Sequence, residues 1–322
     1  MLNILEDLKI NSFHKIAGDA SFRSFYRVKY QNKNCIFVYC EKDKKNNLDN
    51  YYKINKFLRN NKLLSPKTFK FNSKKNFMLI EDLGKQSYHA FLQQQKNKFT
   101  VYKKLVDELI KIQSIPFIQV KKITQFYSKQ KLIKESNLFF EWYLPRVFKK
   151  KKALVVTRKI KKILFPLFDQ LSCPNHYFVH RDFHVSNLIR HGDKVGIIDS
   201  QDALLGNPSY DLMSLIDDVR IKTSLQLKKQ IFQYYLSKTK ISYAKEVSSF
   251  QKDFDILSIQ RSLKIIGIFS RLCIRDKKKN YIKMLPYVWS LLHLRLKNPC
   301  FVELAKVIKK YFPKKLIQKT II

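Results

Sequence analysis

The chain of 322 residues has no long hydrophobic run. No apolar stretch reaches the ~18 residues that a membrane-spanning helix requires, so we expect no membrane insertion. The first residues, Met1 to Asp7, also lack a basic segment followed by an apolar stretch. They therefore do not have the pattern of a secretory signal peptide.

Cysteine is scarce, and its spacing excludes a disulfide framework. The five cysteines are scattered and form no C-x-x-C pair; they stand at positions 35, 40, 173, 273 and 300. An odd number of cysteines without a regular spacing favours reduced thiols. We therefore expect a cytoplasmic protein without a zinc site.

Acidic residues are few compared with basic ones. The chain has 25 Asp and Glu against 64 Lys and Arg, a formal net charge of +39. Such a charge is typical of proteins that bind nucleic acid or a membrane surface. The basic residues, however, are spread over the whole chain, and Lys, Asn, Ile and Phe, which share A/T-rich codons, are abundant together. We therefore interpret the charge as a composition bias, and expect runs such as 149–152 in loops or at helix ends.

Hydrophobic periodicity divides the chain into a strand-rich beginning and a helical remainder. The hydrophobic content of 45% is sufficient for a sizeable core. Alternating or continuous apolar runs predict strands at 12–17, 22–30, 35–40, 67–71 and 76–80. The helical repeat predicts helices at 2–9, 49–61, 99–115, 133–148, 159–171, 256–274, 281–296 and 302–311. Strands first and helices afterwards indicate an α+β protein.

A dense polar cluster lies between two apolar runs at residues 180–187. The pattern is typical of a strand that delivers a loop and a second strand that leaves it. The next apolar strand ends on Asp199. Phosphoryl transfer needs a base that orients the attacking hydroxyl and oxygen ligands that hold Mg²⁺. We assign the base to Asp182 and the metal ligands to Asn187 and Asp199.

The spacing His180-x-Asp182-x₄-Asn187, followed by Ile198-Asp199, resembles the catalytic and metal motifs of the kinase superfamily. It is similar to the aminoglycoside-phosphotransferase and choline-kinase branch, whereas protein kinases have Phe-Gly after the second Asp. Four further strings are Gly18-Asp19-Ala20-Ser21-Phe22-Arg23, Phe140-Glu141-Trp142-Tyr143-Leu144-Pro145-Arg146, Ile198-Asp199-Ser200-Gln201-Asp202-Ala203 and Gly267-Ile268-Phe269-Ser270-Arg271-Leu272. Together they resemble the bacterial N-acetylmuramate/N-acetylglucosamine anomeric kinases, over nearly the whole chain.

This resemblance implies a bilobal protein-kinase-like fold. A small N-terminal lobe with an antiparallel β-sheet, residues 1–84, would bind the nucleotide. A larger, mainly helical C-terminal lobe, residues 85–322, would carry the catalytic loop and the substrate site. The implied cofactors are ATP and Mg²⁺, and the implied partner is a small molecule, with an amino sugar favoured; we expect a monomer. The product would be a sugar 1-phosphate.

The resemblance also implies nucleotide-binding residues. Main-chain groups around Gly18, with the Ser21 hydroxyl, would cover the phosphates. Main-chain groups of Glu81 and Leu83 would hydrogen-bond adenine at the hinge between the lobes. Kinases usually place a phosphate-pairing Lys on the strand predicted at 35–40, but that strand has none.

The cation that pairs with the phosphates therefore stays unassigned. Lys29 and Lys42 are the candidates to replace the strand Lys. The following helix, predicted at 49–61, has no Glu that could hold such a Lys. Four polar residues are assigned to the substrate: Arg181, His184, Asp202 and Arg261. We expect His180 to fix the catalytic loop through hydrogen bonds.

Three alternatives remain open. A kinase could instead act on choline, another amino alcohol or an aminoglycoside, although a cationic acceptor would want acidic residues, which are few in the helical part. The net charge and the missing strand Lys would also fit a non-catalytic nucleic-acid-binding protein on a kinase scaffold. A protein kinase is a third alternative, but only the short segment 200–209 separates Asp199 from the next helix, which leaves no activation segment.

Overall fold

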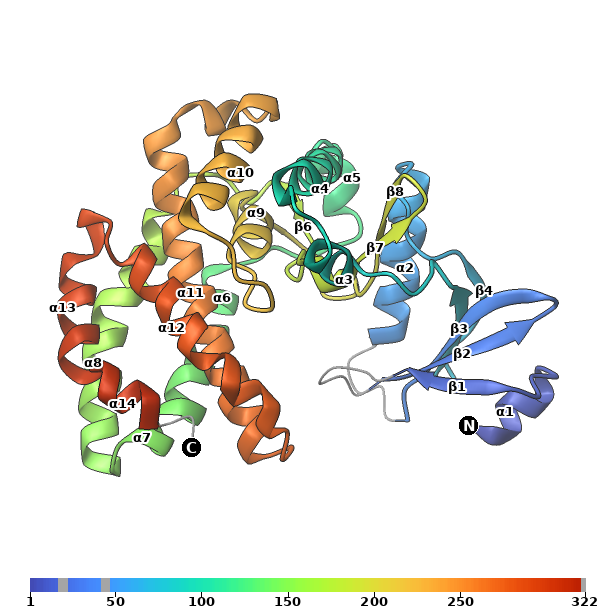
Figure 1. Ribbon diagram of the computed structural model, residues 1–322, viewed down its shortest axis with the longest axis horizontal. Coiled ribbons are helices and arrows are strands. Elements are labelled where there is room, and N and C mark those ends of the chain that lie inside the picture. The colour runs from blue at the N-terminus through green and yellow to red at the C-terminus, as the bar shows by residue number, and fades with distance from the viewer. Residues whose placement is uncertain (17–22, 42–46, 320–322) are drawn as a thin grey trace. The chain divides into compact units, whose positions relative to one another are not determined.

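The computed structural model describes residues 1–16, 23–41 and 47–319. The chain forms two compact units (Figure 1). The first comprises Met1–Thr124 together with His180–Leu204, and the second comprises Gln125–Val179 together with Leu205–Ile322. The first unit thus contains residues 1–84, predicted as the nucleotide-binding lobe, together with residues 85–124 and 180–204.

A five-stranded antiparallel sheet forms the centre of the first unit, with the strand order β1-β2-β3-β5-β4. The strands are β1 (Phe13–Ile16), β2 (Ser24–Tyr30), β3 (Lys33–Tyr39), β4 (Thr68–Asn72) and β5 (Phe77–Glu81). The β2–β3 hairpin closes at Gln31 and Asn32, whose positive φ angles of 47° and 61° suit the turn that matches the strand twist. The predicted antiparallel sheet is therefore confirmed.

The two faces of this sheet bury different side chains. Because side chains alternate along a strand, Phe37 and Leu79 lie on one face with the residues of α1 (Leu2–Asp7). Val38 and Met78 lie on the other face with α2 (Asn47–Asn60). Figure 1 shows both helices beside the sheet. The helix α2 is thereby held by apolar contacts, which leaves its remaining side chains available for other contacts.

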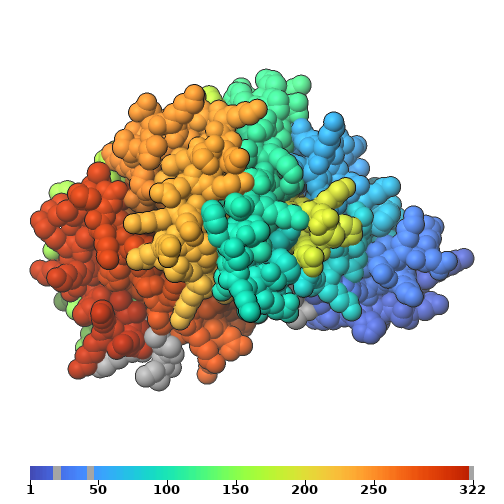
Figure 2. All heavy atoms as spheres, turned by 45° about the horizontal axis from the view of Figure 1, so that its top comes forward, coloured from blue at the N-terminus to red at the C-terminus, as the bar shows by residue number. Residues whose placement is uncertain are grey.

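A second hairpin belongs to the same unit although it comes much later in the sequence. Its strands are β7 (Leu188–His191) and β8 (Lys194–Ile197), joined at Gly192 with a φ of 56°. The Ile197 N–H donates to the Leu64 carbonyl at 2.7 Å, so the hairpin is tied to the chain just before β4. The hairpin also packs on α3 (Tyr88–Gln93) and α4 (Lys98–Gln113), and it reaches the surface beside them in Figure 2.

The second unit is mainly helical, which confirms the larger helical part predicted from the sequence. Its helices are α6 (Lys129–Leu138), α7 (Leu144–Val147), α8 (Lys150–Leu167), α9 (Ser209–Ile216), α10 (Leu225–Lys238), α11 (Val247–Ile274), α12 (Leu285–Arg295), α13 (Val302–Tyr311) and α14 (Lys314–Lys319). The short strands β6 (Tyr177–Val179) and β9 (Leu204–Gly206) pair with each other. The long helix α11 is buried along most of its length, and it packs on α6, α9 and α12. None of the helices in the described part of the chain combines the length and the apolar character needed to cross a bilayer.

Three helices differ clearly from their predicted bounds. The helix predicted at 256–274 begins earlier, at Val247. The helix predicted at 133–148 consists of α6, a π-helical turn (Phe139–Tyr143) and α7. The helix predicted at 159–171 begins earlier, at Lys150, because exposed lysines suit the solvent side of an amphipathic helix. The lysine run at 149–152 is accordingly a helix start, as predicted.

Gly267 explains how α11 and the π-helical turn pack. A Cβ atom at Gly267 would lie 2.3 Å from the Leu138 carbonyl carbon and 2.5 Å from the Phe139 nitrogen. These are backbone atoms at the start of the π-helical turn, so they cannot move aside as a flexible side chain would. Close packing therefore offsets the ~1 kcal/mol that a glycine costs inside a helix.

A buried ionic cluster joins four elements of the second unit. The Asp217 carboxylate receives two hydrogen bonds from the Arg295 guanidinium, at 2.8 and 2.9 Å, one from Lys228 at 3.0 Å and one from Ser258 at 2.7 Å. The side chains of Asp217 and Lys228 are only 3% and 6% exposed. Burial alone would raise the pKa of Asp217, but Arg295 and Lys228 outweigh burial and hold it well below its usual value.

We expect Gly267→Ala to destabilise the protein by about 1–3 kcal/mol, because the added methyl group would press on rigid backbone. Helix propensity alone predicts the opposite sign, a gain of about 1 kcal/mol. Chemical denaturation followed by circular dichroism measures the difference. Ser248→Ala, at an exposed position of the same helix, serves as the control and should change the free energy of unfolding by less than about 0.5 kcal/mol. A stabilised Gly267→Ala variant would contradict the packing described.

We expect Asp217→Ala to lower the free energy of unfolding by roughly 3–5 kcal/mol. The change leaves Lys228 without its carboxylate and leaves Arg295 with only its 3.5 Å contact to Asp255. Urea denaturation provides the measurement. The matched control is Glu303→Ala, which removes the carboxylate of an exposed ion pair with Lys306. Exposed pairs contribute about 0–1 kcal/mol, so similar losses in the two variants would contradict a structural role for the buried cluster.

Candidate active site

The catalytic loop lies between β6 and β7 and is fastened to the end of β8 by His180. The ring is fully buried, and its Nε2 donates to the Ile198 carbonyl at 3.0 Å. Burial lowers the pKa of His180, although the neighbouring Asp182 and Asp199 act in the opposite direction. The imidazole thus holds the loop through this hydrogen bond, which is the structural role that the sequence predicted for it.

Hydrogen bonds inside the loop fix Asp182 relative to Asn187. The Asp182 carbonyl accepts from the His184 N–H at 2.9 Å and from the Asn187 side-chain Nδ2 at 3.1 Å. Because Nδ2 is engaged in this way, Oδ1 is the side-chain atom of Asn187 that suits a metal. Asp182 is half-buried.

Asp199 follows β8 and lies next to the catalytic loop. The Ile198 N–H donates to the Asn187 carbonyl at 3.1 Å, so the segments that carry the two predicted metal ligands are directly joined. Arg181 and Asp199 both adopt positive φ angles, 73° and 64°. A left-handed backbone costs a residue with a side chain about 1–3 kcal/mol, and such residues cluster at functional sites. The strain therefore supports a functional role for both motifs.

Arg23 is a member of this site that sequence analysis missed. Its guanidinium lies 2.6 Å from Asp199 Oδ1 and 2.8 Å from Gln201 Oε1. The Arg23 side chain is 7% exposed, whereas that of Asp199 is 34% exposed. The only signal in the sequence was the string that ends on Arg23, to which no role was assigned.

The helix α2 provides two further residues that the sequence did not point to. The Tyr51 hydroxyl accepts from the Asp199 N–H at 3.4 Å, and Asn55 Oδ1 accepts from the Ser200 hydroxyl at 3.1 Å. Burial raises the pKa of Tyr51, and the charge of Asp199 adds to this effect. This helix has no Glu, and Tyr51 and Asn55 connect it to the segment after β8 instead.

Three of the predicted residues, Arg181, Asp199 and Asp202, form a connected network with Arg23 and Gln201. Arg181 donates to the Asp202 carbonyl at 3.0 Å, and its guanidinium lies 3.7 Å from the Asp202 carboxylate. Gln201 Nε2 donates to Asp202 Oδ2 at 3.2 Å. Asp199 joins the network through Arg23. His184 is buried, and its Nε2 atom lies 3.4 Å from Asn187 Nδ2.

The remaining predicted residues lie elsewhere or outside the described part of the chain. Arg261 lies in the second unit, buried within α11. Gly18 and Ser21 fall outside the described residues, as does Lys42. Lys29 lies at an exposed position of β2.

The predicted hinge residues follow β5 directly. The Glu81 N–H donates to the Lys67 carbonyl at 2.8 Å, and the Leu83 carbonyl accepts from His191 Nδ1 at 3.0 Å. The main-chain N–H of Glu81 and the main-chain carbonyl of Leu83 are therefore engaged within the protein. The Glu81 carbonyl and the Leu83 N–H are the groups that could serve an adenine ring.

The site fits a magnesium ion through the chemistry of its donors. Asn187 and Asp199 supply an amide oxygen and a carboxylate, and Mg²⁺ is commonly held by one or two such oxygens together with water and substrate phosphates. The described residues contain no group of three or more His, Cys, Asp and Glu that would form an all-protein cage. The Asp199 carboxylate already binds a cation, Arg23, which shows that its surroundings favour positive charge.

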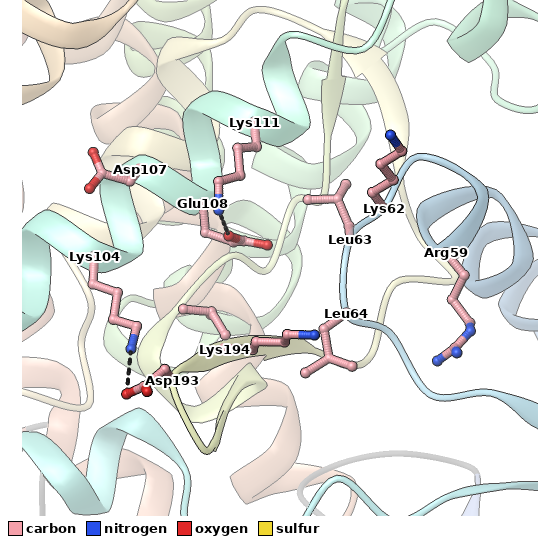
Figure 3. A pocket seen from close by; sticks show the side chains of 11 residues that line it. Arg59, Lys62, Leu63, Leu64, Lys104, Asp107, Glu108, Lys111, Asp193 and Lys194 are labelled. Carbon is pink, nitrogen blue, oxygen red and sulfur yellow. Dashed lines mark hydrogen bonds and ion pairs between the residues drawn. The ribbon is translucent and has the colours of Figure 1, made fainter.

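A cavity of about 450 Å³ elsewhere in the first unit does not belong to this site (Figure 3). It lies between the end of α2, α4 and the β7–β8 turn, and none of its lining residues is a predicted site residue. Its charges are largely paired: Lys111 lies 2.9 Å from Glu108, and Lys104 lies 4.0 Å from Asp193.

Known proteins resemble the chain in both sequence and fold. An N-acetylmuramate/N-acetylglucosamine kinase of Neisseria meningitidis serogroup B is 26% identical over 296 residues, which cover 90% of this chain and 86% of the relative. A protein of the same description from Pseudomonas putida is 26% identical over 315 residues, which cover 95% of this chain and 90% of the relative.

Solved structures share the fold at lower identity. The ADP-bound aminoglycoside phosphotransferase APH(2'')-Ib aligns with a TM-score of 0.63 at 17% identity, over 93% of this chain and 97% of that one. An ethanolamine kinase of Plasmodium vivax aligns with a TM-score of 0.63 at 15% identity, over 87% of this chain and 81% of that one. The fold is therefore protein-kinase-like. The model of the phosphotransferase enzyme family matches residues 12–246, and the chain belongs to this family.

Proposed function

We propose that the chain is an ATP- and Mg²⁺-dependent kinase that phosphorylates the anomeric hydroxyl of N-acetylmuramate or N-acetylglucosamine. The observation that supports a kinase most directly is that hydrogen bonds join the segments that carry Asp182, Asn187 and Asp199. Asn187 Nδ2 donates to the Asp182 carbonyl, and the N–H of Ile198, next to Asp199, donates to the Asn187 carbonyl. The acceptor is supported by the relatives described as N-acetylmuramate/N-acetylglucosamine kinases, which align along most of their length.

In this proposal Asp182 orients the acceptor. Its carboxylate accepts a hydrogen bond from the anomeric hydroxyl and takes the proton as the acceptor oxygen bonds to the γ-phosphorus. The bond from the γ-phosphorus to the bridging oxygen breaks, and ADP leaves with that oxygen. Positioning and electrostatic stabilisation provide most of the catalysis in such a reaction. Asn187 and Asp199 would hold Mg²⁺, which supplies the positive charge that phosphoryl transfer requires.

The other assignments belong to the same proposal. Residues 1–84 would bind the nucleotide, with the Glu81 carbonyl and the Leu83 N–H at adenine and Gly18 and Ser21 at the phosphates. Residues 85–322 would provide the catalytic loop and the substrate site. The sugar would be contacted by polar side chains, for which we propose Arg181, His184, Asp202 and Arg261.

The fold alone does not identify the molecule that accepts the phosphate. Aminoglycoside and ethanolamine phosphotransferases share it, so an amino sugar, an amino alcohol and an aminoglycoside must be compared directly. Because of the +39 charge, RNA binding should be measured as well. A basic protein that binds RNA does so with a steep dependence on salt concentration.

We expect ADP release from Mg²⁺-ATP to depend on N-acetylmuramate or N-acetylglucosamine, with little turnover on choline, ethanolamine or an aminoglycoside. Phosphorus NMR should locate the new phosphate on the anomeric carbon. Asp182→Asn should lower kcat by about 10²- to 10⁴-fold, the usual contribution of a positioned base. Asp193→Asn, the same change at an exposed turn of the first unit, should leave kcat unchanged.

Three results would contradict this proposal in different ways. Turnover on another acceptor only would keep the kinase and reject the amino sugar. Equal activity of the Asp182→Asn and Asp193→Asn variants would reject Asp182 as the base. No turnover and no nucleotide binding, together with salt-dependent RNA binding, would favour the nucleic-acid-binding alternative.

A further inference from the structure

The nucleotide phosphates need a cation that the usual strand position does not provide. The only Lys of β3 is Lys33, at the exposed first position of the strand. The helix α2 carries no Glu that could hold a Lys in the site. In phosphoryl transfer a positively charged side chain pairs with the phosphates. A kinase with this fold therefore requires a replacement from another element.

Arg23 lies where such a cation is needed. It precedes β2, and its guanidinium contacts Asp199, the proposed metal ligand, at 2.6 Å. A metal held by Asp199 would bring the phosphate oxygens that share it close to the same guanidinium. An arginine presents five N–H donors in a planar fork that matches carboxylate and phosphate oxygens.

The surroundings of Arg23 hold the guanidinium in a fixed position. It lies over the Phe25 ring at 5.4 Å and over the Tyr51 ring at 5.5 Å, and it donates to Gln201 at 2.8 Å. Burial at 7% exposure strengthens these electrostatic contacts, because little water competes with them. Tyr51 belongs to α2, so this helix orients the cation through an aromatic ring where other kinases use a Glu.

We propose that Arg23 is the phosphate-binding cation of this enzyme and replaces the missing strand Lys. In the absence of nucleotide it neutralises Asp199, and on nucleotide binding its guanidinium pairs with the phosphate oxygens. This inference rests on the proposed function. Arg23 is a nucleotide-binding residue in this proposal, and the negative charge of the phosphates is what it recognises.

Nucleotide binding by the full chain tests the proposal without turnover. Isothermal titration calorimetry compares ADP with adenosine, each in Mg²⁺ and in EDTA, for the wild type, Arg23→Met and Arg23→Lys. Arg190→Met is the control, because its guanidinium contacts Gln86 and the Phe91 ring. We expect Arg23→Met to weaken ADP binding about 10- to 100-fold, the range of a charge-assisted hydrogen bond. Adenosine binding should stay unchanged, and Arg23→Lys should lie between.

Each other outcome overturns a defined part of the proposal. Unchanged or tighter ADP binding by Arg23→Met in EDTA would show that Arg23 only neutralises Asp199. Equal losses for adenosine and ADP would show that it only maintains the fold. A wild type that binds neither ligand would contradict the proposed function itself. Should Arg23→Met fail to fold, Arg23→Gln decides, because it keeps hydrogen-bond donors without the charge. An unchanged ADP affinity of that variant would reject Arg23 as the phosphate-binding cation.

Discussion

The negative charge of Asp199 is the feature on which the order of the site depends. A partly buried carboxylate must be compensated by a cation or by hydrogen bonds, and here Arg23 provides the cation. The main chain of the same segment is held separately: the Asp199 N–H donates to the Tyr51 hydroxyl of α2, and the Ile198 N–H donates to the Asn187 carbonyl of the catalytic loop. The ion pair with Arg23 and these main-chain hydrogen bonds together connect the segment after β8 with the sheet, with α2 and with the catalytic loop of the first unit.

The second unit obtains its stability from separate interactions. Its ionic cluster around Asp217 and the close contact of Gly267 with the π-helical turn both fix the long helix α11 against its neighbours. The family model spans residues 12–246 and thus parts of both units, so both belong to the phosphotransferase architecture.

Sequence predicted well what is encoded locally. Alternation along β2 and the helical repeat of α13 gave the elements, and the motif spacing indicated Asp182, Asn187 and Asp199, whose segments the structure joins. Their chemical roles stay predictions. Arg23 was missed because its partner lies 176 residues away, and no periodicity within one element reports such a contact. The π-helical turn was missed because its aromatic spacing is also compatible with a continuous helix.

The measurement that tests the central claim most directly is the binding of Mn²⁺, as a paramagnetic substitute for Mg²⁺, to the protein in the presence of ADP. Electron paramagnetic resonance detects the free ion as the protein is titrated. The account predicts that Asp199→Asn weakens Mn²⁺ binding by at least about tenfold, since a charged ligand contributes more than a neutral one. Asp193→Asn should bind Mn²⁺ as the wild type does. Equal Mn²⁺ affinity of the wild type and Asp199→Asn would contradict the assignment of the metal to Asp199.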